Sequence, residues 1–457
     1  MLLVATYELG HQPANLARPA ALLAARGHEV RVVDTSLDPW VPDDAIWADA
    51  VAFSVPMHTA TRLARELADG LDRPTCAFGL YAHVCDDAVD RAISGEYEDA
   101  LVAWVEEGHH ASLPTVGGAS VELGRATPRH RGTLPARALL PPLTRYAALE
   151  TDGDRRLVGS IEATRGCAHR CRHCPVPVVY DGRVRVADEA DVLADVAQLV
   201  ALGATHLNFG DPDFLNAPQH ARRVVTGVHD AFPALTFDCT VKVEHVLRYD
   251  DVWADFAAKG CLFVVSAFES VDDATLVRLD KGHTTADAAR AVSLLRAHGI
   301  DVQPSFLPFT PWTTREHLVA LLDFVHEHDL VGSVDPVQYS IRLLLPRGSL
   351  LLGHPDVLPH LGEWDPARLT STWSAADPAM DDLQREVAAV VERSLAAGDD
   401  VTTTYALVRA TVGAPPVDLC GCTIDRPRLT ESWFCCAEPT DAQLRAVGRS
   451  PSSATLR

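Results

Sequence analysis

The chain has 457 residues, of which 47% are hydrophobic and 22% are charged, so it can bury two or three domain cores. Its 62 acidic and 40 basic residues give a formal net charge of −22. The negative electrostatic potential of such a chain repels phosphate backbones, which disfavours a nucleic-acid substrate. No apolar run approaches the roughly 20 residues of a membrane helix, and the first residues lack a basic leader. We therefore expect a cytoplasmic protein with no membrane partner.

Residues 1–106 alternate between short apolar runs and helical stretches. Such alternation predicts an α/β domain with an open, Rossmann-like parallel sheet covered by helices. Ligands of these sheets bind at the carboxyl ends of the strands, so the segments that follow the apolar runs are expected to line a site. The expected strands are residues 2–5, 28–34, 50–55 and 76–80, and the expected helices are residues 13–26 and 59–69.

The pattern breaks over residues 107–157, where glycine and proline punctuate a stretch of little periodicity, which predicts a linker. Residues 158–349 resume the alternation and predict a partial (β/α)6 TIM-like barrel, whose reactive edge lies at the strand carboxyl ends. Residues 350–457 form a mixed region with a cysteine-rich tail. The expected barrel strands are residues 158–164, 205–210, 235–243, 262–268, 301–308 and 337–345, and the helices lie near 189–202, 219–231, 250–259, 285–298 and 314–328.

The chain contains eleven cysteines. In a long chain without an export signal, metal binding or catalysis is a better explanation for them than disulfides. Three lie together at 167–174 and four at 420–436. The scattered ones, which are Cys76, Cys85, Cys239 and Cys261, are expected to be small buried hydrophobic residues.

Cys167, Cys171 and Cys174 have the spacing C-x3-C-x2-C and follow the first expected barrel strand. Three thiolates on one loop can each bind one iron of a [4Fe–4S] cluster, which leaves the fourth iron without a ligand from this motif. An open iron indicates substrate or cofactor chemistry. The alternative is a zinc site completed by His169 or His173.

This segment resembles the signature of the radical S-adenosylmethionine (radical SAM) superfamily, in which an aromatic residue precedes the third cysteine. His173 occupies that place. The resemblance implies that the open iron chelates the amino and carboxylate groups of S-adenosylmethionine. One electron from the cluster, supplied by a donor such as flavodoxin or ferredoxin, then cleaves a sulfur–carbon bond of that cofactor. The protein itself would supply orientation and a dry cavity.

Gly210, Asp211 and Asp213 end the second expected barrel strand. The family commonly has a Gly-Gly-Glu-like segment there that holds the methionyl amino group, so the resemblance implies that these two carboxylates bind the cofactor. The Gly-Asp-Pro-Asp pattern departs from the usual one. A plain turn between strand and helix is the alternative.

Lys242 ends the third strand, and Ser266 and Glu269 end the fourth. By the same resemblance this edge contacts the ribose and carboxylate of the cofactor, whereas solvated strand-end charges are the alternative. Arg342 lies within an expected apolar strand. Because an unpaired buried charge is costly, Arg342 is expected either to bind an anionic group of the cofactor or to form a structural ion pair.

The amino-terminal domain resembles the cobalamin-binding module that precedes many radical SAM barrels. The resemblance rests on residues 7–13, on Gly27-His28-Glu29-Val30 and on Gly95-Glu96-Tyr97-Glu98. It implies a bound cobalamin, but no Asp-x-His-x-x-Gly motif is present, so no histidine of that motif would ligate cobalt. A module retained only for packing is the alternative.

Four cysteines lie near the end of the chain: Cys420, Cys422, Cys435 and Cys436. They could form a second metal centre, a redox pair or a trap for a thiophilic element, with a zinc staple as the structural alternative. The run Cys-Cys-Ala-Glu-Pro resembles the tail of a radical SAM group (CUAEP/CCAEP) in which selenocysteine can replace the second cysteine. We therefore expect Cys435 and Cys436 to act catalytically, on the substrate or on an arsenic- or selenium-like atom.

Taken together, these patterns predict an enzyme that uses a [4Fe–4S] cluster and S-adenosylmethionine for group transfer or rearrangement on a small molecule. Methyl transfer assisted by cobalamin competes with transfer of another fragment, such as the aminocarboxypropyl group. A non-catalytic iron–sulfur or zinc protein that senses redox state or metalloids is an alternative from a different class. A peptide-modifying enzyme is a third, but no substrate-docking domain is evident.

Overall fold

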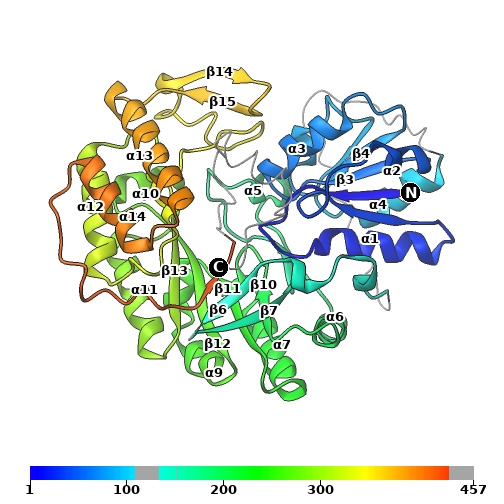
Figure 1. Ribbon diagram of the computed structural model, residues 1–457, viewed down its shortest axis with the longest axis horizontal. Coiled ribbons are helices and arrows are strands. Elements are labelled where there is room, and N and C mark those ends of the chain that lie inside the picture. The colour runs from blue at the N-terminus through cyan, green and yellow to red at the C-terminus, as the bar shows by residue number, and fades with distance from the viewer. Residues whose placement is uncertain (109–132, 152, 432–457) are drawn as a thin grey trace.

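The computed structural model describes residues 1–108, 133–151 and 153–431. The amino-terminal part is a five-stranded sheet in the order β2-β1-β3-β4-β5, and every neighbouring pair is parallel, as predicted (Figure 1). The fifth strand was not predicted. The strands are β1 (Leu2–Ala5), β2 (Arg31–Asp34), β3 (Val51–Ser54), β4 (Thr75–Phe78) and β5 (Arg91–Ile93), and the helices are α1 (Ala14–Ala25), α2 (Pro42–Trp47), α3 (His58–Ala68), η1 (Ala82–Val84) and α4 (Glu98–Glu106).

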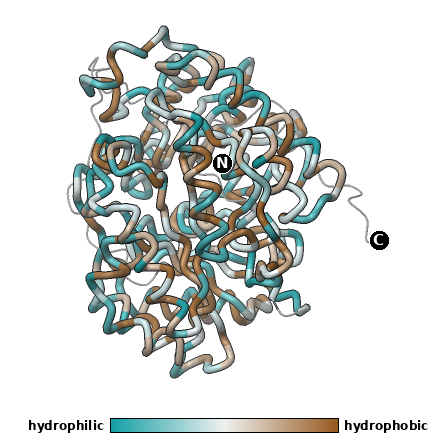
Figure 2. The backbone as a smooth tube through the Cα atoms, turned by 90° about the vertical axis from the view of Figure 1, so that its left-hand side faces the viewer, coloured by the Kyte–Doolittle hydropathy of each residue, from teal (hydrophilic) through white to brown (hydrophobic). Residues whose placement is uncertain are grey.

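The central strand β1 explains why this part folds as a two-sided layer. All four of its residues are buried and apolar, as expected where both faces of a parallel sheet are covered. Leu3 packs in one core cluster with residues of α1 and α4. Leu2 packs in a second cluster with residues of α2 and α3. In Figure 2, brown hydrophobic segments run through the middle of the molecule, and teal segments are frequent along its outer loops.

The second part is a curled half-barrel whose sheet has the order β13-β12-β11-β10-β7-β6-β16. The first five strands in this order are parallel, and β6 and β16 are antiparallel additions. The strands are β6 (Ala148–Thr151), β7 (Asp154–Ile161), β10 (His206–Phe209), β11 (Thr236–Thr240), β12 (Cys261–Glu269), β13 (Asp301–Phe306) and β16 (Arg428–Leu429). The helices around them are α6 (Glu189–Ala201), η4 (Phe214–Asn216), α7 (Pro218–Ala231), α8 (Val243–Arg248), η5 (Asp250–Val252), α9 (Trp253–Ala258), α10 (Asp273–Leu279), α11 (Thr285–Ala297) and α12 (Arg315–Glu327).

The sixth expected strand, residues 337–345, does not form. Its start is the 3-10 helix η6 (Pro336–Tyr339), and a single parallel bridge between Phe309 and Arg342 is the ladder pairing found there. Pro336 cannot donate to a ladder, and the Asp335 side chain accepts the N–H of Val337 at 2.9 Å, so the local bonds favour a turn. The barrel therefore remains open at this edge.

The predicted linker is also more ordered than expected. Its described residues contain two 3-10 turns, η2 (Arg137–Leu139) and η3 (Leu143–Arg145), and the hairpin of β6 with β7. This segment packs because Arg137 is buried between the two parts of the molecule.

The carboxyl-terminal region lies against the open edge of the barrel (Figure 1). The chain then returns to the barrel sheet, where β16 pairs with β6. No helix among the described residues is both long and apolar enough to cross a membrane. The elements of this region are η7 (Leu358–His360), the hairpin β14 (Leu361–Asp365) with β15 (Thr370–Trp373), and the packed helices α13 (Pro378–Ala397) and α14 (Val401–Val412).

Candidate functional site

A cavity of about 1000 Å³ lies between the two sheets. The carboxyl ends of β1, β3 and β4 contribute Glu8, Met57 and Leu80 to its lining, and the barrel contributes residues from the ends of its strands. Its volume is at the upper end of the range for small-molecule sites. Both edges that the sequence predicted as ligand-binding therefore meet in one space.

Cys167, Cys171 and Cys174 all line this cavity. They are free thiols on the loop between β8 (Thr164–Gly166) and α5 (Val176–Tyr180). The chain after α5 returns as β9 (Val184–Val186), which pairs with β8. Gly166 shapes the entry to the loop: its φ is 76°, and a Cβ would collide with the Arg183 carbonyl and approach the Tyr180 ring to 2.7 Å. The N–H of Ala168 donates to Asn216 Oδ1 at 3.1 Å. Three soft thiols on a constrained loop fit an iron–sulfur cluster.

His173 is buried beside the third cysteine and joins a charged network. Its Nε2 lies 3.0 Å from Glu269 Oε1, and Lys281 Nζ donates to the same oxygen at 3.1 Å. Burial alone would raise the pKa of Glu269, but Lys281 and His173 outweigh it and hold that pKa far below its ordinary value. Glu269 is thus a paired carboxylate that orients His173. Lys281 was missed because a lysine between two helices resembles an ordinary surface residue in sequence.

Gly210 and Asp211 lie at the cavity edge, as predicted. The carboxylate of Asp211 is buried and accepts the N–H groups of Ala163 at 3.0 Å and Thr164 at 2.5 Å, and the Thr164 hydroxyl at 2.6 Å. Burial raises the pKa of Asp211 to about 7. These three bonds hold the chain that leads into the cysteine loop, so Asp211 positions that loop.

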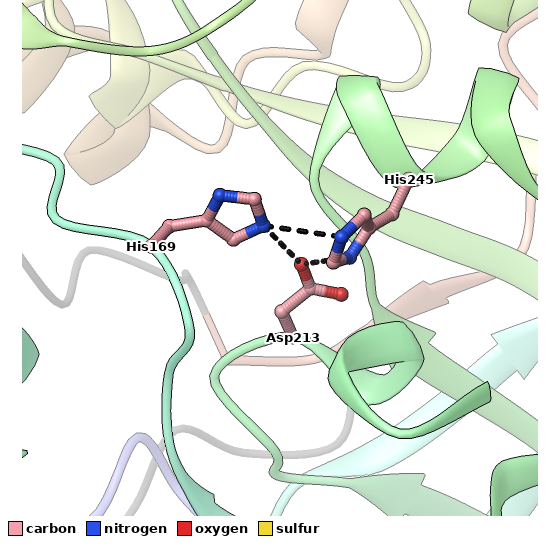
Figure 3. Close-up of side chains that lie close together, drawn as sticks. All are labelled: His169, Asp213 and His245. Atoms are coloured by element: carbon pink, nitrogen blue, oxygen red, sulfur yellow. Dashed lines mark hydrogen bonds and ion pairs between the residues drawn. The ribbon is translucent and has the colours of Figure 1, made fainter. Parts of the chain in front are cut away.

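Asp213 lies close to two histidines, His169 and His245, at the cavity wall (Figure 3). Lys242 contacts His169 there as well. Asp213 Oδ2 lies 2.7 Å from His245 Nδ1 and 3.8 Å from His169 Nε2. The two histidine Nε2 atoms are 3.2 Å apart, and Lys242 Nζ is 3.0 Å from His169 Nδ1. Burial, with Lys242 and His245, lowers the pKa of His169 to about 4. His245 was not predicted, because a histidine in a short helix carries no spacing signal.

Ser266 and Arg342 are not among the described lining residues of the cavity. The hydroxyl of Ser266 donates to the Val241 carbonyl at 2.7 Å. Arg342 donates to Asp381 and to the Trp373 carbonyl, both at 2.6 Å, and its guanidinium lies 3.5 Å from the centre of the Trp373 ring. Arg342 therefore forms the structural ion pair that was the alternative to an anion-binding role.

Arg165, which was also missed, connects the cysteine loop to the amino-terminal sheet. It donates to Glu162 Oε2 at 2.8 Å and to Glu98 Oε1 at 2.6 Å, and it lies 5.2 Å from the centre of the Tyr97 ring. Two features of the sequence could have indicated this role. Arg165 directly precedes Gly166 beside the cysteine motif, and its partners belong to the Gly-Glu-Tyr-Glu run at 95–98. This contact ties the two parts of the molecule together at the cavity.

The tail cysteines are only partly described. Cys420 is exposed and Cys422 is half-buried, whereas Cys435 and Cys436 lie outside the described residues. A second metal centre or a catalytic pair in the tail therefore stays a prediction.

Glu8 makes the stability of the folded protein depend on pH. Its carboxylate accepts from Ser54 at 3.2 Å and Asn15 at 3.4 Å, yet burial, with repulsion from Asp34 and Glu162, raises its pKa to about 8. Folded protein therefore binds a proton that the unfolded chain loses near pH 4.5, and stability falls as pH rises toward 8. Glu8→Gln is expected to gain stability over the parent progressively from pH 5 to pH 8.

Urea denaturation of both proteins at pH 5, 7 and 9 measures this gain. Glu66→Gln, at an exposed position on α3, is the matched control and should show no growing difference. A constant difference between Glu8→Gln and the parent at all three pH values would contradict the elevated pKa.

Comparisons with known proteins agree with this site. Residues 161–325 match the family model described as "Radical SAM superfamily". The ribosomal protein uS12 methylthiotransferase RimO of Thermus thermophilus is 47% identical over 47 residues, which is 10% of this chain and 11% of that protein. The match thus spans only a small fraction of the curated relative.

Two solved structures share the fold over most of the chain. The cobalamin-dependent S-adenosylmethionine radical enzyme OxsB, with aqua-cobalamin bound, superposes with a TM-score of 0.64 at 13% identity, covering 84% of this chain and 66% of that one. The radical S-adenosylmethionine methyltransferase TsrM from Kitasatospora setae, with cobalamin and a [4Fe–4S] cluster bound, superposes with a TM-score of 0.54 at 21% identity, covering 72% and 70%. Residues 161–325 therefore form a radical SAM domain, which indicates an enzyme.

Proposed function

We propose that this enzyme transfers a methyl group from S-adenosylmethionine to a small organic molecule, with cobalamin bound at the carboxyl edge of the amino-terminal sheet. The observation that carries the proposal is the shared cavity: one space of about 1000 Å³ is lined both by the cysteine triad and by the ends of β1, β3 and β4. A donor, a cofactor and an acceptor held in one cavity react without diffusing apart.

The residues present fit these groups. Cys167, Cys171 and Cys174 would hold the cluster, and the cluster would supply the electron that opens the sulfonium cofactor. On the opposite wall Gly79 and Gly95, with φ of 117° and 81°, line the cavity and let a flat ligand approach the backbone. Cobalamin, when bound there, would supply a cobalt centre that can carry a methyl group.

The chain's own side chains would position and shield the reactants. Asp211 fixes the cysteine loop through three hydrogen bonds. Lys281 and Glu269 hold His173 against the third cysteine. Arg165 keeps the two walls of the cavity in register through Glu98. The similarity of the fold to OxsB and TsrM, whose structures contain cobalamin, supports the proposal that cobalamin binds on the amino-terminal side of the cavity.

Anaerobic reconstitution tests this function. Full-length protein supplied with iron, sulfide and hydroxocobalamin, then passed through a gel-filtration column, is expected to retain about four irons and one cobalt per chain. Incubation with S-adenosylmethionine and a reductant should consume that cofactor. Retention of iron without cobalt, with cofactor cleavage intact, would contradict the cobalamin-dependent route and favour transfer of another fragment.

A matched pair of variants on α1 tests where cobalamin binds. Ala14 lines the cavity at the start of the helix, whereas Ala25 is exposed at its end. Ala14→Trp should lower cobalt retention at least tenfold and leave the iron content unchanged, because it fills the amino-terminal side of the cavity. Ala25→Trp should retain both metals. Equal cobalt in the two variants would place cobalamin elsewhere.

The finer predictions remain open to the same assays. Action of Cys435 and Cys436 on a metalloid-containing substrate, membership of the CUAEP/CCAEP group, and reduction by flavodoxin or ferredoxin all stay predictions.

A further inference from the structure

A compact set of nitrogen and oxygen donors lies beside the cysteine triad. His169, Asp213 and His245 each direct one ligand atom into the same small space, and these atoms lie within 4.8 Å of one another (Figure 3). His169 comes from the cysteine loop, Asp213 from the loop after β10, and His245 from α8. Two loops and one helix thus converge on one point at the carboxyl edge of the barrel.

Two of the buried atoms at this point lack hydrogen bonds. Asp213 Oδ2 and His245 Nδ1 are buried and, within the described part of the chain, neither has a hydrogen-bond partner. They approach to 2.7 Å, but their geometry is not that of a hydrogen bond. Buried polar groups are normally satisfied, and leaving two of them without a partner destabilises the fold. The two Nε2 atoms of the histidines contact each other at 3.2 Å, but the two unsatisfied atoms beside them indicate that the cluster is built to hold a cation.

A hydrogen bond to the other oxygen of Asp213 fixes the orientation of its carboxylate. Asp213 Oδ1 accepts the N–H of Leu215 at 3.1 Å, which leaves Oδ2 as a single ligand atom. On the far side of His169, Nδ1 lies 3.7 Å from Glu244 Oε2. A histidine that binds metal through Nε2 carries its proton on Nδ1 and commonly donates it to a carboxylate, and Glu244 is placed to accept it.

We propose that His169, Asp213 and His245 bind one divalent transition-metal ion of the zinc(II) class at the wall of the cavity. Two imidazoles and one carboxylate suit zinc and its first-row neighbours, whereas magnesium and calcium prefer oxygen ligands alone. Three protein ligands leave at least one coordination position open. His169 and Asp213 both line the cavity, so the open position faces it and would take an oxygen or nitrogen donor of a small molecule.

Lys242 is the competitor to the metal. Its Nζ lies 3.0 Å from His169 Nδ1 and 3.3 Å from Glu244 Oε2. In the metal-free protein it donates to His169, which places the proton of that ring on Nε2, the ligand atom. When the metal binds, the proton of His169 must move from Nε2 to Nδ1. Lys242 can then no longer donate to Nδ1 and keeps only its bond to Glu244. Removing the ammonium should therefore strengthen metal binding.

Cobalt(II) titration of a cluster-free full-length variant tests the proposal without depending on the proposed function. With Cys167, Cys171 and Cys174 all replaced by alanine, one equivalent of cobalt(II) should bind with visible ligand-field bands and no sulfur-to-cobalt charge-transfer band. His169→Gln and His245→Gln should each weaken binding at least 10- to 100-fold, the loss typical of an outer partner alone. Lys242→Met should tighten it, and His298→Ala, at the end of α11, should change nothing.

Two results would overturn the site. One is equal cobalt affinity of the parent, His169→Gln and His245→Gln, with circular dichroism showing all three folded. The other is a bound cobalt with sulfur-to-cobalt charge transfer alone, which would place the metal on the tail cysteines. If a variant fails to fold, zinc-edge X-ray absorption of the cluster-bearing parent decides the point, because a first shell of nitrogen and oxygen supports the site and a sulfur shell excludes it. Absence of methyl transfer would leave this result unchanged.

Discussion

Cys171→Ala is expected to leave a folded protein that cannot assemble its cluster or cleave S-adenosylmethionine. Cys171 is buried and lies between Cys167 and Cys174 in the loop, and each of the three thiolates would hold one iron of the proposed cluster. Two remaining thiolates cannot hold a cube against loss to solvent. The measurement is iron and sulfide content after anaerobic reconstitution, which should fall from about four of each to near zero. Cleavage of the sulfonium cofactor under reducing conditions should fall to background with it.

Cys261→Ala is the matched control for this experiment. Cys261 is a buried thiol at the start of β12, and it is not among the described lining residues of the cavity. The control should keep its iron and its activity and lose only a small amount of stability. A Cys171→Ala protein that retained four irons and cleaved the cofactor would remove the triad from the mechanism.

Arg137→Ala is expected to lower the free energy of unfolding by about 3–5 kcal/mol, because it leaves a buried carboxylate without its partner. Arg137 donates to both oxygens of Asp195, at 3.0 and 2.8 Å, and also to the Ser160 carbonyl at 2.9 Å. A weaker bond at 3.4 Å reaches Gln12 at the edge of the amino-terminal sheet. The side chains of Arg137 and Asp195 are 2% and 8% exposed, so water cannot replace the lost bonds. Urea denaturation at neutral pH measures the effect.

Arg145→Ala, in the same connecting segment, is its control. The ion pair of Arg145 with Asp38 has side chains 40% and 54% exposed, and exposed pairs contribute only about 0–1 kcal/mol. If the two variants lost equal stability, the buried pair would not be what holds the segment in place. Loss of cobalt retention in Arg137→Ala with intact iron would show that the segment also positions the amino-terminal sheet.

Local patterns predicted the elements whose causes are local. The apolar run of β1 and the helical stretch of α6 each follow from a few neighbouring residues, and both form where they were expected. The cysteine triad was recognisable for the same reason, since all three cysteines lie on one loop. The alternation of strands and helices then placed that loop at the carboxyl edge of a parallel sheet.

The failed strand at 337–345 shows the limit of such patterns. Its apolar residues are buried, as a strand would require, but burial comes from packing against α13 and α14 instead of from a ladder. An apolar run reports that a segment is inside and does not report its hydrogen-bond partners. The ion pair of Arg342 could not be predicted for the same reason, because its partner Asp381 is 39 positions away on α13.

The cysteine loop and the alternation that builds the two sheets could be predicted from the residue order, because both depend on residues close together in the chain. Three contacts emerged only from folding: Lys281 pairs with Glu269, Arg137 pairs with Asp195, and His245 lies beside His169 and Asp213. The partners in these contacts lie on different elements, so their meeting depends on how the sheets curl and pack. A charged residue in a loop has the same appearance in sequence whether it faces water or completes a buried site.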